Sequence, residues 1–159
     1  MTARKLICGT NVVEKVGSEA MRLGAKKVLI VTDKGIREAG LDQKVIKSLS
    51  SKNIKYEIFD EVVPNPTIEN VEKGLDLLKT EDCDCVIGLG GGSSIDCAKA
   101  IGIMATNPGN LRQYSSREGG EIKNRTIPLI VINTTAGTGS ESGIGAVITD
   151  TEKKVKRII

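Results

Sequence analysis

A strand that runs through a glycine turn into a helix organises this sequence, at residues 86–99 (VIGLGGGSSIDCAK). Three successive glycines leave no side chain between the backbone and whatever lies above it. The amides of Gly91, Gly92 and Ser93 would point outward at the start of the helix, where unpaired N–H groups and a partial positive charge favour a phosphate. The alternative is a plain helix cap, with Ser93 as the N-cap and Asp96 three residues later. Both can hold, but a cap does not need three preceding glycines, so we favour a phosphate-binding turn.

Apolar runs that alternate with helical stripes predict an α/β fold around this turn. Continuous runs are typical of strands covered on both faces, and apolar residues three and four apart are typical of helices. We expect strands at residues 27–32, 56–59, 85–89 and 127–132, an edge strand at 6–8, and helices at 11–23, 35–51, 68–78 and 93–106. Two short strands, 144–149 and 155–159, would form a C-terminal β-hairpin. The alternation predicts right-handed βαβ units, and therefore a Rossmann-like, mainly parallel sheet with helices on both faces.

The residues that follow these strands are suited to ligand binding. Asp33 comes just after the first strand, Asn65 lies in a proline-flanked loop after the second, and the glycine turn follows the third. A second turn, 133–141 (NTTAGTGSE), is rich in hydroxyls and glycine and follows the fourth. Because the carboxyl ends of parallel strands lie at one edge of a sheet, we expect these groups to gather there and form a site.

Neither common nucleotide motif fits the glycine turn. Counted from Gly88, the sixth position of a G-x-G-x-x-G fingerprint is Ser93, and the candidate acid, Asp33, precedes the turn instead of following it. No Lys-Ser or Lys-Thr follows either glycine turn, which excludes a P-loop. We expect Asp33 to accept a hydrogen bond from a ribose hydroxyl, with a plain helix cap as the alternative. Lys99, three residues after Asp96, is as consistent with a surface ion pair as with a ligand contact.

Composition and charge narrow the class of protein. The 159 residues suit one domain, and the net charge of +3 comes from acids and bases mixed along the chain. Because no basic block with aromatic residues occurs, we expect no nucleic-acid partner. Because no apolar run approaches about 18 residues, we expect no membrane span. The first residues lead into no signal-peptide core, so a cytoplasmic location is the expectation.

Four cysteines and no histidine bear on metal binding. Cys83 and Cys85 have C-x-C spacing near the start of a strand, where both would face the same side. With no second close pair and no histidine, we expect free, mostly buried thiols in a reducing compartment and no zinc site.

Five short motifs carry a resemblance to a known family. They are VTD at 31–33, VPNPT at 63–67, GGGSSIDCAK at 90–99, TTAGTGSE at 134–141 and VITD at 147–150. In this order they resemble the iron-containing (group III) alcohol dehydrogenases over essentially the whole chain. The resemblance implies that residues 1–159 form an NAD(P)-binding domain, with NAD as the expected cofactor. The cofactor-binding residues that it implies are Gly90 in the turn, Gly91, Gly92 and Ser93 at the pyrophosphate, Asp33 at the adenosine ribose, Asp96 towards the nicotinamide, and Asn65, Thr134, Thr135, Thr138 and Lys156 at further nucleotide positions.

The resemblance also implies parts that lie outside this sequence. Family members continue into an all-helical domain that supplies one aspartate and three histidines to iron or zinc, whereas this sequence stops at Ile159 and has no histidine. We therefore expect the cofactor-binding half of an NAD- and metal-dependent dehydrogenase that acts on a primary alcohol or diol. No catalytic residue and no metal ligand would lie in this chain, which would be inactive alone. It would expose the apolar surface where the helical domain docks, so we expect self-association into a homo-oligomer.

Two other functions remain open from the sequence. Dehydroquinate synthase and glycerol-phosphate dehydrogenase share the sheet and the Gly-Gly-Gly-Ser turn, although the stretch at 134–141 favours the alcohol dehydrogenases. A stand-alone nucleotide-binding module without catalysis is the other alternative.

Overall fold

Four parallel strands form the central sheet of the computed structural model, which describes residues 5–159. They are β1 (Lys27–Val31), β2 (Lys55–Phe59), β3 (Cys85–Gly90) and β4 (Leu129–Asn133), in the spatial order β2-β1-β3-β4. Ile30 of β1 lies opposite Ile58 of β2 on one side and Ile87 of β3 on the other. The predicted Rossmann-like, mainly parallel sheet is therefore confirmed.

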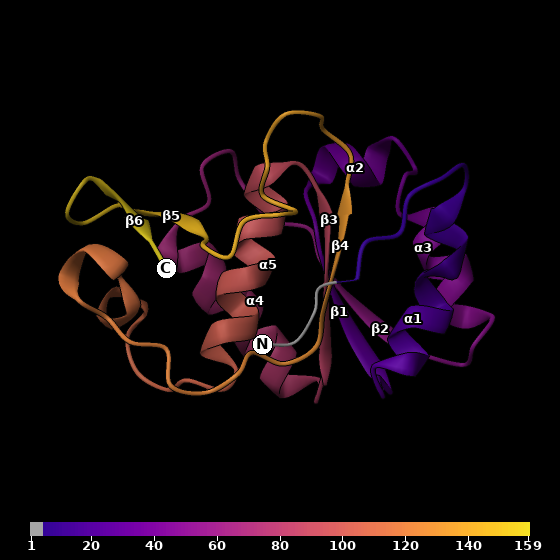
Figure 1. The fold of residues 1–159 in the computed structure, drawn as a ribbon, viewed down its shortest axis with the longest axis horizontal. Helices are drawn as coiled ribbons and strands as arrows, with labels where there is room; N and C mark the ends of the chain where they lie inside the picture. Colours follow the sequence, from indigo (N-terminus) through magenta and orange to yellow (C-terminus); the bar gives the residue numbers. More distant parts are fainter. Residues whose placement is uncertain (1–4) are drawn as a thin grey trace.

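Helices cover both faces of this sheet (Figure 1). In that view α4 and α5 lie on the side of the C-terminal hairpin, and α1 and α3 lie on the opposite side. The α-helices are α1 (Val16–Arg22), α2 (Lys34–Glu38), α3 (Gln43–Ser50), α4 (Ile68–Thr80) and α5 (Gly92–Met104), and the 3-10 turns are η1 (Val12–Lys15), η2 (Leu111–Tyr114) and η3 (Ser116–Glu118). None of the helices within residues 5–159 is long and apolar enough to cross a lipid bilayer.

Two hydrophobic cores join the layers, one on each face of the sheet. Leu29 and Val31 of β1 belong to the core with α4 and α5, whereas Val28 and Ile30 belong to the core with α1 and α3. The central strands β1 and β3 are buried almost throughout because both of their faces are covered. The prediction of a fully covered strand is wrong for β4, which lies at the edge of the sheet and is only partly buried.

Glycines in the left-handed conformation end two of the helices. Gly24 follows α1 with a φ of +82°, and Gly40 follows α2 with a φ of +66°. The single helix predicted for residues 35–51 is therefore wrong, since Gly40 separates α2 from α3. Leu41 lies in this break and is exposed. The helix predicted for residues 11–23 is also divided, because the 3-10 turn η1 precedes the α-helix α1.

Two further local predictions are wrong. Residues 6–8 form no strand. Leu6 is 82% exposed and does not pack into either hydrophobic core. Cys83 precedes β3 and lies in the core with α4, whereas Cys85 is within the strand and lies in the opposite core. All four cysteines are free and three are buried, as expected. Burial raises the pKa of the Cys97 thiol to about 12, which leaves it protonated near neutral pH.

An antiparallel hairpin of β5 (Val147–Asp150) and β6 (Val155–Ile158) follows the sheet, as predicted. A charge network ties it to the long loop after α5. Asp150 accepts hydrogen bonds from Arg112 Nε at 2.9 Å and from Arg157 Nε at 2.8 Å, and Arg157 Nη1 lies 2.6 Å from Glu118 Oε1. Because Asp150 and Arg157 are buried, loss of either side chain would leave the other buried charge with fewer partners and would destabilise the fold.

This network predicts a dependence of stability on pH. The Arg112 guanidinium, with further hydrogen bonds from Lys153 N–H and Arg157, holds the pKa of the Asp150 carboxyl well below its ordinary value of 3.8. The contribution of Asp150 to the free energy of unfolding is therefore complete above about pH 4 and is lost as the pH falls towards the lowered pKa. Asp150→Asn should lower the thermal unfolding midpoint near neutral pH, and this deficit should shrink in acid.

Thermal denaturation followed by circular dichroism at several pH values measures both effects. Asp76→Asn, at an exposed carboxylate on α4, is the matched control and should change little. A deficit for Asp150→Asn that stays constant from neutral pH into strong acid would contradict the assignment.

Candidate functional site

An open cleft of about 910 Å³ lies at the carboxyl ends of β1 and β3. The strand order reverses there, because the chain runs outward from β1 to β2 and then returns to the other side of β1 for β3. Ligands of open α/β sheets bind at such switch points. The predicted site residues that line the cleft are Asp33, Gly91, Gly92, Ser93, Thr134 and Thr135.

The remaining predicted residues do not line the cleft. They are Gly90, Asn65, Asp96, Thr138 and Lys156. The lining also contains residues that the sequence reasoning missed, namely Lys34–Ile36, Asp60–Pro64 and Ser94. Segment 60–64 directly follows β2, so the strand-end rule that selected Asp33 could have identified it too. No local pattern singles out Ser94, because its role depends on a contact distant in sequence.

The first turn of α5 forms one wall of the cleft. Gly91 is its N-cap, the helix begins at Gly92, and no side chain caps this end. The hypothesis of a Ser93 cap is therefore wrong, and the Ser93 hydroxyl instead accepts a hydrogen bond from the Asn65 amide at 3.3 Å. The first turn holds no acidic residue of its own, so the positive end of the helix dipole is not neutralised within the turn. Such a terminus can bind an anion.

The hydroxyl-rich turn after β4 packs over the glycine turn. A Cβ at Gly91 would lie 3.1 Å from the Thr135 hydroxyl. A Cβ at Gly92 would lie 3.1 Å from the Ser140 hydroxyl and 3.4 Å from Thr138 Cβ. Two motifs far apart in the sequence therefore form one cradle, in which side-chain hydroxyls surround bare glycine backbone. Ser140 belongs to this cradle although it is not in the predicted set.

Asp33 also lines the cleft, beside the glycine turn, and is held at both carboxylate oxygens. Oδ1 accepts a hydrogen bond from the Ile36 amide at 3.1 Å, which makes Asp33 the N-cap of α2. Oδ2 accepts one from the Ser94 hydroxyl, also at 3.1 Å. Asp33 therefore does cap a helix, as the alternative interpretation held. The cap still leaves acceptor capacity on both carboxylate oxygens for a ligand.

A bridge of polar contacts joins the hairpin to the glycine turn. Lys156 Nζ donates to Asn65 Oδ1 at 2.8 Å, and the Asn65 amide donates to Ser93 as described above. Asn65 has a left-handed φ of +57°, a conformation that asparagine tolerates better than most residues. Residues separated widely in the sequence therefore meet beside the first turn of α5.

Asp96 and Lys99 form a buried pair, so the alternative of a surface ion pair is wrong. Lys99 Nζ lies 3.3 Å from Asp96 Oδ1 and donates to the Gly145 carbonyl at 2.9 Å. Asp96 Oδ2 accepts a hydrogen bond from the Val147 amide at 3.0 Å. Both side chains thereby fasten the start of the hairpin to α5.

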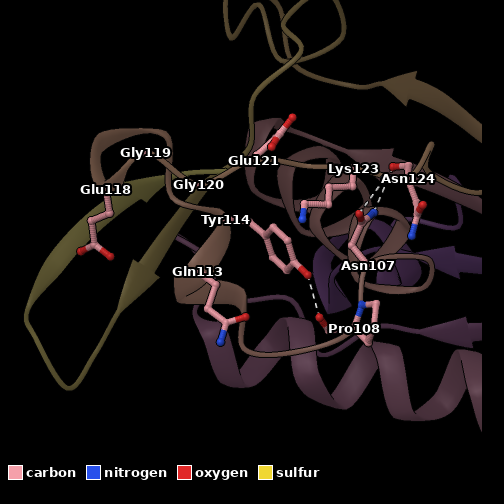
Figure 2. A pocket seen from close by; sticks show the side chains of 10 residues that line it. All are labelled: Asn107, Pro108, Gln113, Tyr114, Glu118, Gly119, Gly120, Glu121, Lys123 and Asn124. Carbon is pink, nitrogen blue, oxygen red and sulfur yellow. Dashed lines mark hydrogen bonds between the residues drawn. The ribbon is translucent and has the colours of Figure 1, made fainter.

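A second hollow, of about 480 Å³, lies in the loop between α5 and β4. Figure 2 shows its wall, where the Tyr114 hydroxyl donates to the Pro108 carbonyl at 2.6 Å and Asn107 bonds to Asn124. Among the described residues that line it, none belongs to the predicted cofactor set. The site argument therefore rests on the cleft at the switch point.

The residues present fit a dinucleotide but not iron. The glycine cradle and the uncapped start of α5 suit a pyrophosphate, because a side chain at Gly91 or Gly92 would enter the space between the two turns. For a metal, the sequence offers no histidine. Within residues 5–159, no three or more Cys, Asp or Glu side chains are grouped so that they could hold a metal ion.

Comparisons with known proteins agree with this architecture. The family model for iron-containing alcohol dehydrogenase matches residues 3–159. Choline dehydrogenase of Bacillus subtilis (strain 168) is 44% identical over 149 residues, which are 93% of this chain and 37% of that protein. NAD-dependent methanol dehydrogenase of Bacillus methanolicus is 41% identical over 150 residues, which are 94% of this chain and 39% of that protein.

The fold of the chain is also similar to that of solved structures. A crystal structure of 1,3-propanediol oxidoreductase matches 95% of this chain and 39% of its own, with a TM-score of 0.90 and 45% identity. The chain spans about two-fifths of the length of the curated relatives that it matches. On the family match over residues 3–159 and this agreement in fold, the chain belongs to the iron-containing alcohol dehydrogenase family.

Proposed function

We propose that this chain is the NAD-binding portion of an NAD-dependent, metal-dependent alcohol dehydrogenase. The observation that carries the proposal is that one cleft is lined both by an uncapped helix start on a glycine turn and by a carboxylate that keeps acceptor capacity. The first feature suits a pyrophosphate and the second suits a ribose diol. The relative from Bacillus methanolicus, described as an NAD-dependent methanol dehydrogenase, supports the choice of cofactor.

The cofactor would lie across the switch point. We place its pyrophosphate against Gly91, Gly92 and Ser93 and its adenosine ribose at Asp33. Thr134, Thr135 and Thr138 would bind further polar atoms from the cradle side. Asn65, in the loop after β2, and Lys156 of the hairpin would do so from another side, and Asp96 of α5 would lie towards the nicotinamide. This portion would orient the dinucleotide for reversible hydride transfer with a primary alcohol or diol.

We place the metal site outside residues 5–159. A divalent metal polarises the alcohol oxygen in this type of reaction. Since the described residues do not fit a metal, its ligands would come from the all-helical domain expected of the family. Dehydroquinate synthase, glycerol-phosphate dehydrogenase and a stand-alone module would share the nucleotide cleft, and the family match over residues 3–159 favours an alcohol dehydrogenase over them.

The glycine cradle is tested by Gly91→Val. Gly91 has an ordinary φ of −82°, and a Cβ there would meet only the Thr135 hydroxyl at 3.1 Å. The variant should therefore fold but should lose detectable NAD binding, because the side chain would occupy the space of the pyrophosphate. Chemical-shift titration of the ¹⁵N-labelled protein measures weak and strong binding alike. Gly91→Ala should give an intermediate loss of affinity. Normal NAD binding by the valine variant would contradict a role of the glycine turn in binding the pyrophosphate.

Cofactor choice is tested at Asp33. A carboxylate accepts a hydrogen bond from the 2′-hydroxyl of NAD and repels the 2′-phosphate of NADP, so NAD should bind more tightly. Asp33→Asn keeps an acceptor for the Ile36 amide but removes the charge, and it should narrow the difference in binding free energy by about 1–3 kcal/mol. Asp33→Gly should narrow it similarly and also lose the α2 cap. Tighter binding of NADP by the unmodified protein would refute this role for Asp33.

The proposal that this chain binds the cofactor but holds neither the metal nor the catalytic activity is tested on the purified 1–159 chain. It should contain no stoichiometric iron or zinc, because imidazole ligands are missing, and it should form no NADH from an alcohol. Elemental analysis and an absorbance assay for NADH measure these two properties. Stoichiometric metal together with turnover would show that catalysis needs nothing beyond this chain.

A further inference from the structure

Ser94 brings a buried hydroxyl into contact with the proposed ribose acceptor. It lies in the first turn of α5 with 1% of its surface exposed, and its Oγ donates to Asp33 Oδ2 at 3.1 Å. Ser94 lines the cleft, but its side chain is almost wholly buried and its hydroxyl proton is donated to Asp33. We therefore expect its hydroxyl to act on a bound dinucleotide through Asp33.

We infer that Ser94 is a positioning residue that holds the Asp33 carboxylate towards a ribose diol and so strengthens the preference for NAD over NADP. This inference rests on the proposed function. The Ile36 amide alone fixes one oxygen and leaves the carboxylate free to swing about that bond. The second hydrogen bond, from Ser94, fixes the other oxygen, so the plane of the carboxylate is set before a ligand arrives.

The glycine turn is shaped to admit this contact. A Cβ at Gly90 would lie 2.7 Å from Ser94 Oγ and 3.4 Å from Asp33 Oδ2. Gly90 also has a φ of +143°, which side chains rarely adopt. The absence of a side chain at Gly90 therefore lets the hydroxyl of α5 reach the acid that follows β1.

Orientation matters because the two cofactors differ at a single group. A fixed carboxylate presents its remaining lone pairs to a 2′-hydroxyl, and the same placement keeps its charge close to a 2′-phosphate. If the carboxylate could rotate, it would lose part of the hydrogen bond to NAD and part of the repulsion of NADP. Loss of Ser94 Oγ should therefore change the ratio of the two affinities and not merely weaken both.

The experiment measures dissociation constants for NAD and NADP by chemical-shift titration of the ¹⁵N-labelled chain. Ser94→Ala should reduce the ratio of affinities in favour of NAD by about three- to tenfold, the range of one lost hydrogen bond. In the Asp33→Asn background the same substitution should change the ratio little, because the group it positions has been altered. Ser94→Cys keeps the size of serine with a weaker donor and should shift the ratio in the same direction.

A matched control comes from Ser48, another buried serine. Its hydroxyl accepts from the Gly17 amide at 2.9 Å and donates to the Glu14 carbonyl at 2.6 Å, where α3 packs against α1. Ser48→Ala should lower the unfolding midpoint and leave the affinity ratio unchanged.

The outcomes separate the two proposals. Absence of binding by the unmodified chain would refute the proposed function and, with it, this role for Ser94. Binding in which Asp33→Asn alters the ratio but Ser94→Ala does not would refute the role of Ser94 alone. An equal loss of affinity for both cofactors, or loss of the fold in both Ser94 variants, would show that Ser94 serves packing, and either result would overturn the inference.

Discussion

The close approach of α5 to β3 is the constraint on which the candidate site depends. A Cβ at Gly88 would lie 2.9 Å from Ala98 Cβ and 3.3 Å from Ile95 Cα, so the helix can lie at this distance only because the strand carries glycine there. Ala98 and Ile95 are themselves fully buried and cannot move outward without opening the core. Since α5 starts directly after β3, this packing sets where the first turn of the helix meets the cleft.

The other parts of the site attach to that helix. Its first turn bonds to Asp33 through Ser94 and to the proline-flanked loop through Ser93. Its next turn holds the start of the hairpin through Asp96, with Lys99 beside it. The cleft is thus an assembly of loops that share one buried helix, which explains how segments with little regular structure can keep a defined geometry.

Carboxylates that accept hydrogen bonds from the protein serve two distinct purposes in this chain. Asp150 and Arg157 join the hairpin to the loop after α5, away from the cleft, and are engaged by protein groups. Asp33 is different, because its two protein hydrogen bonds leave acceptor positions open at the border of the cleft. The two carboxylates also differ in burial, because Asp150 is fully buried and Asp33 is partly exposed. Burial, remaining hydrogen-bonding capacity and position relative to the strand ends together separate the two roles.

The sequence by itself determined the layers of the fold, the glycine turn, the hairpin and the gathering of Asp33 with both turns at one sheet edge. Each of these follows from local patterns, namely apolar periodicity and the residues next to strand ends, together with the rule that parallel strands share an edge. The break between α2 and α3 also has a local cause, because Gly40 adopts a left-handed φ within the stretch that the apolar pattern predicts as one helix. Tertiary structure decided the edge position of β4, the burial of Lys99 and the opposite placement of Cys83 and Cys85. It also decided the contact between Asp33 and Ser94, which are 61 residues apart, because pairings over such distances depend on how whole elements pack.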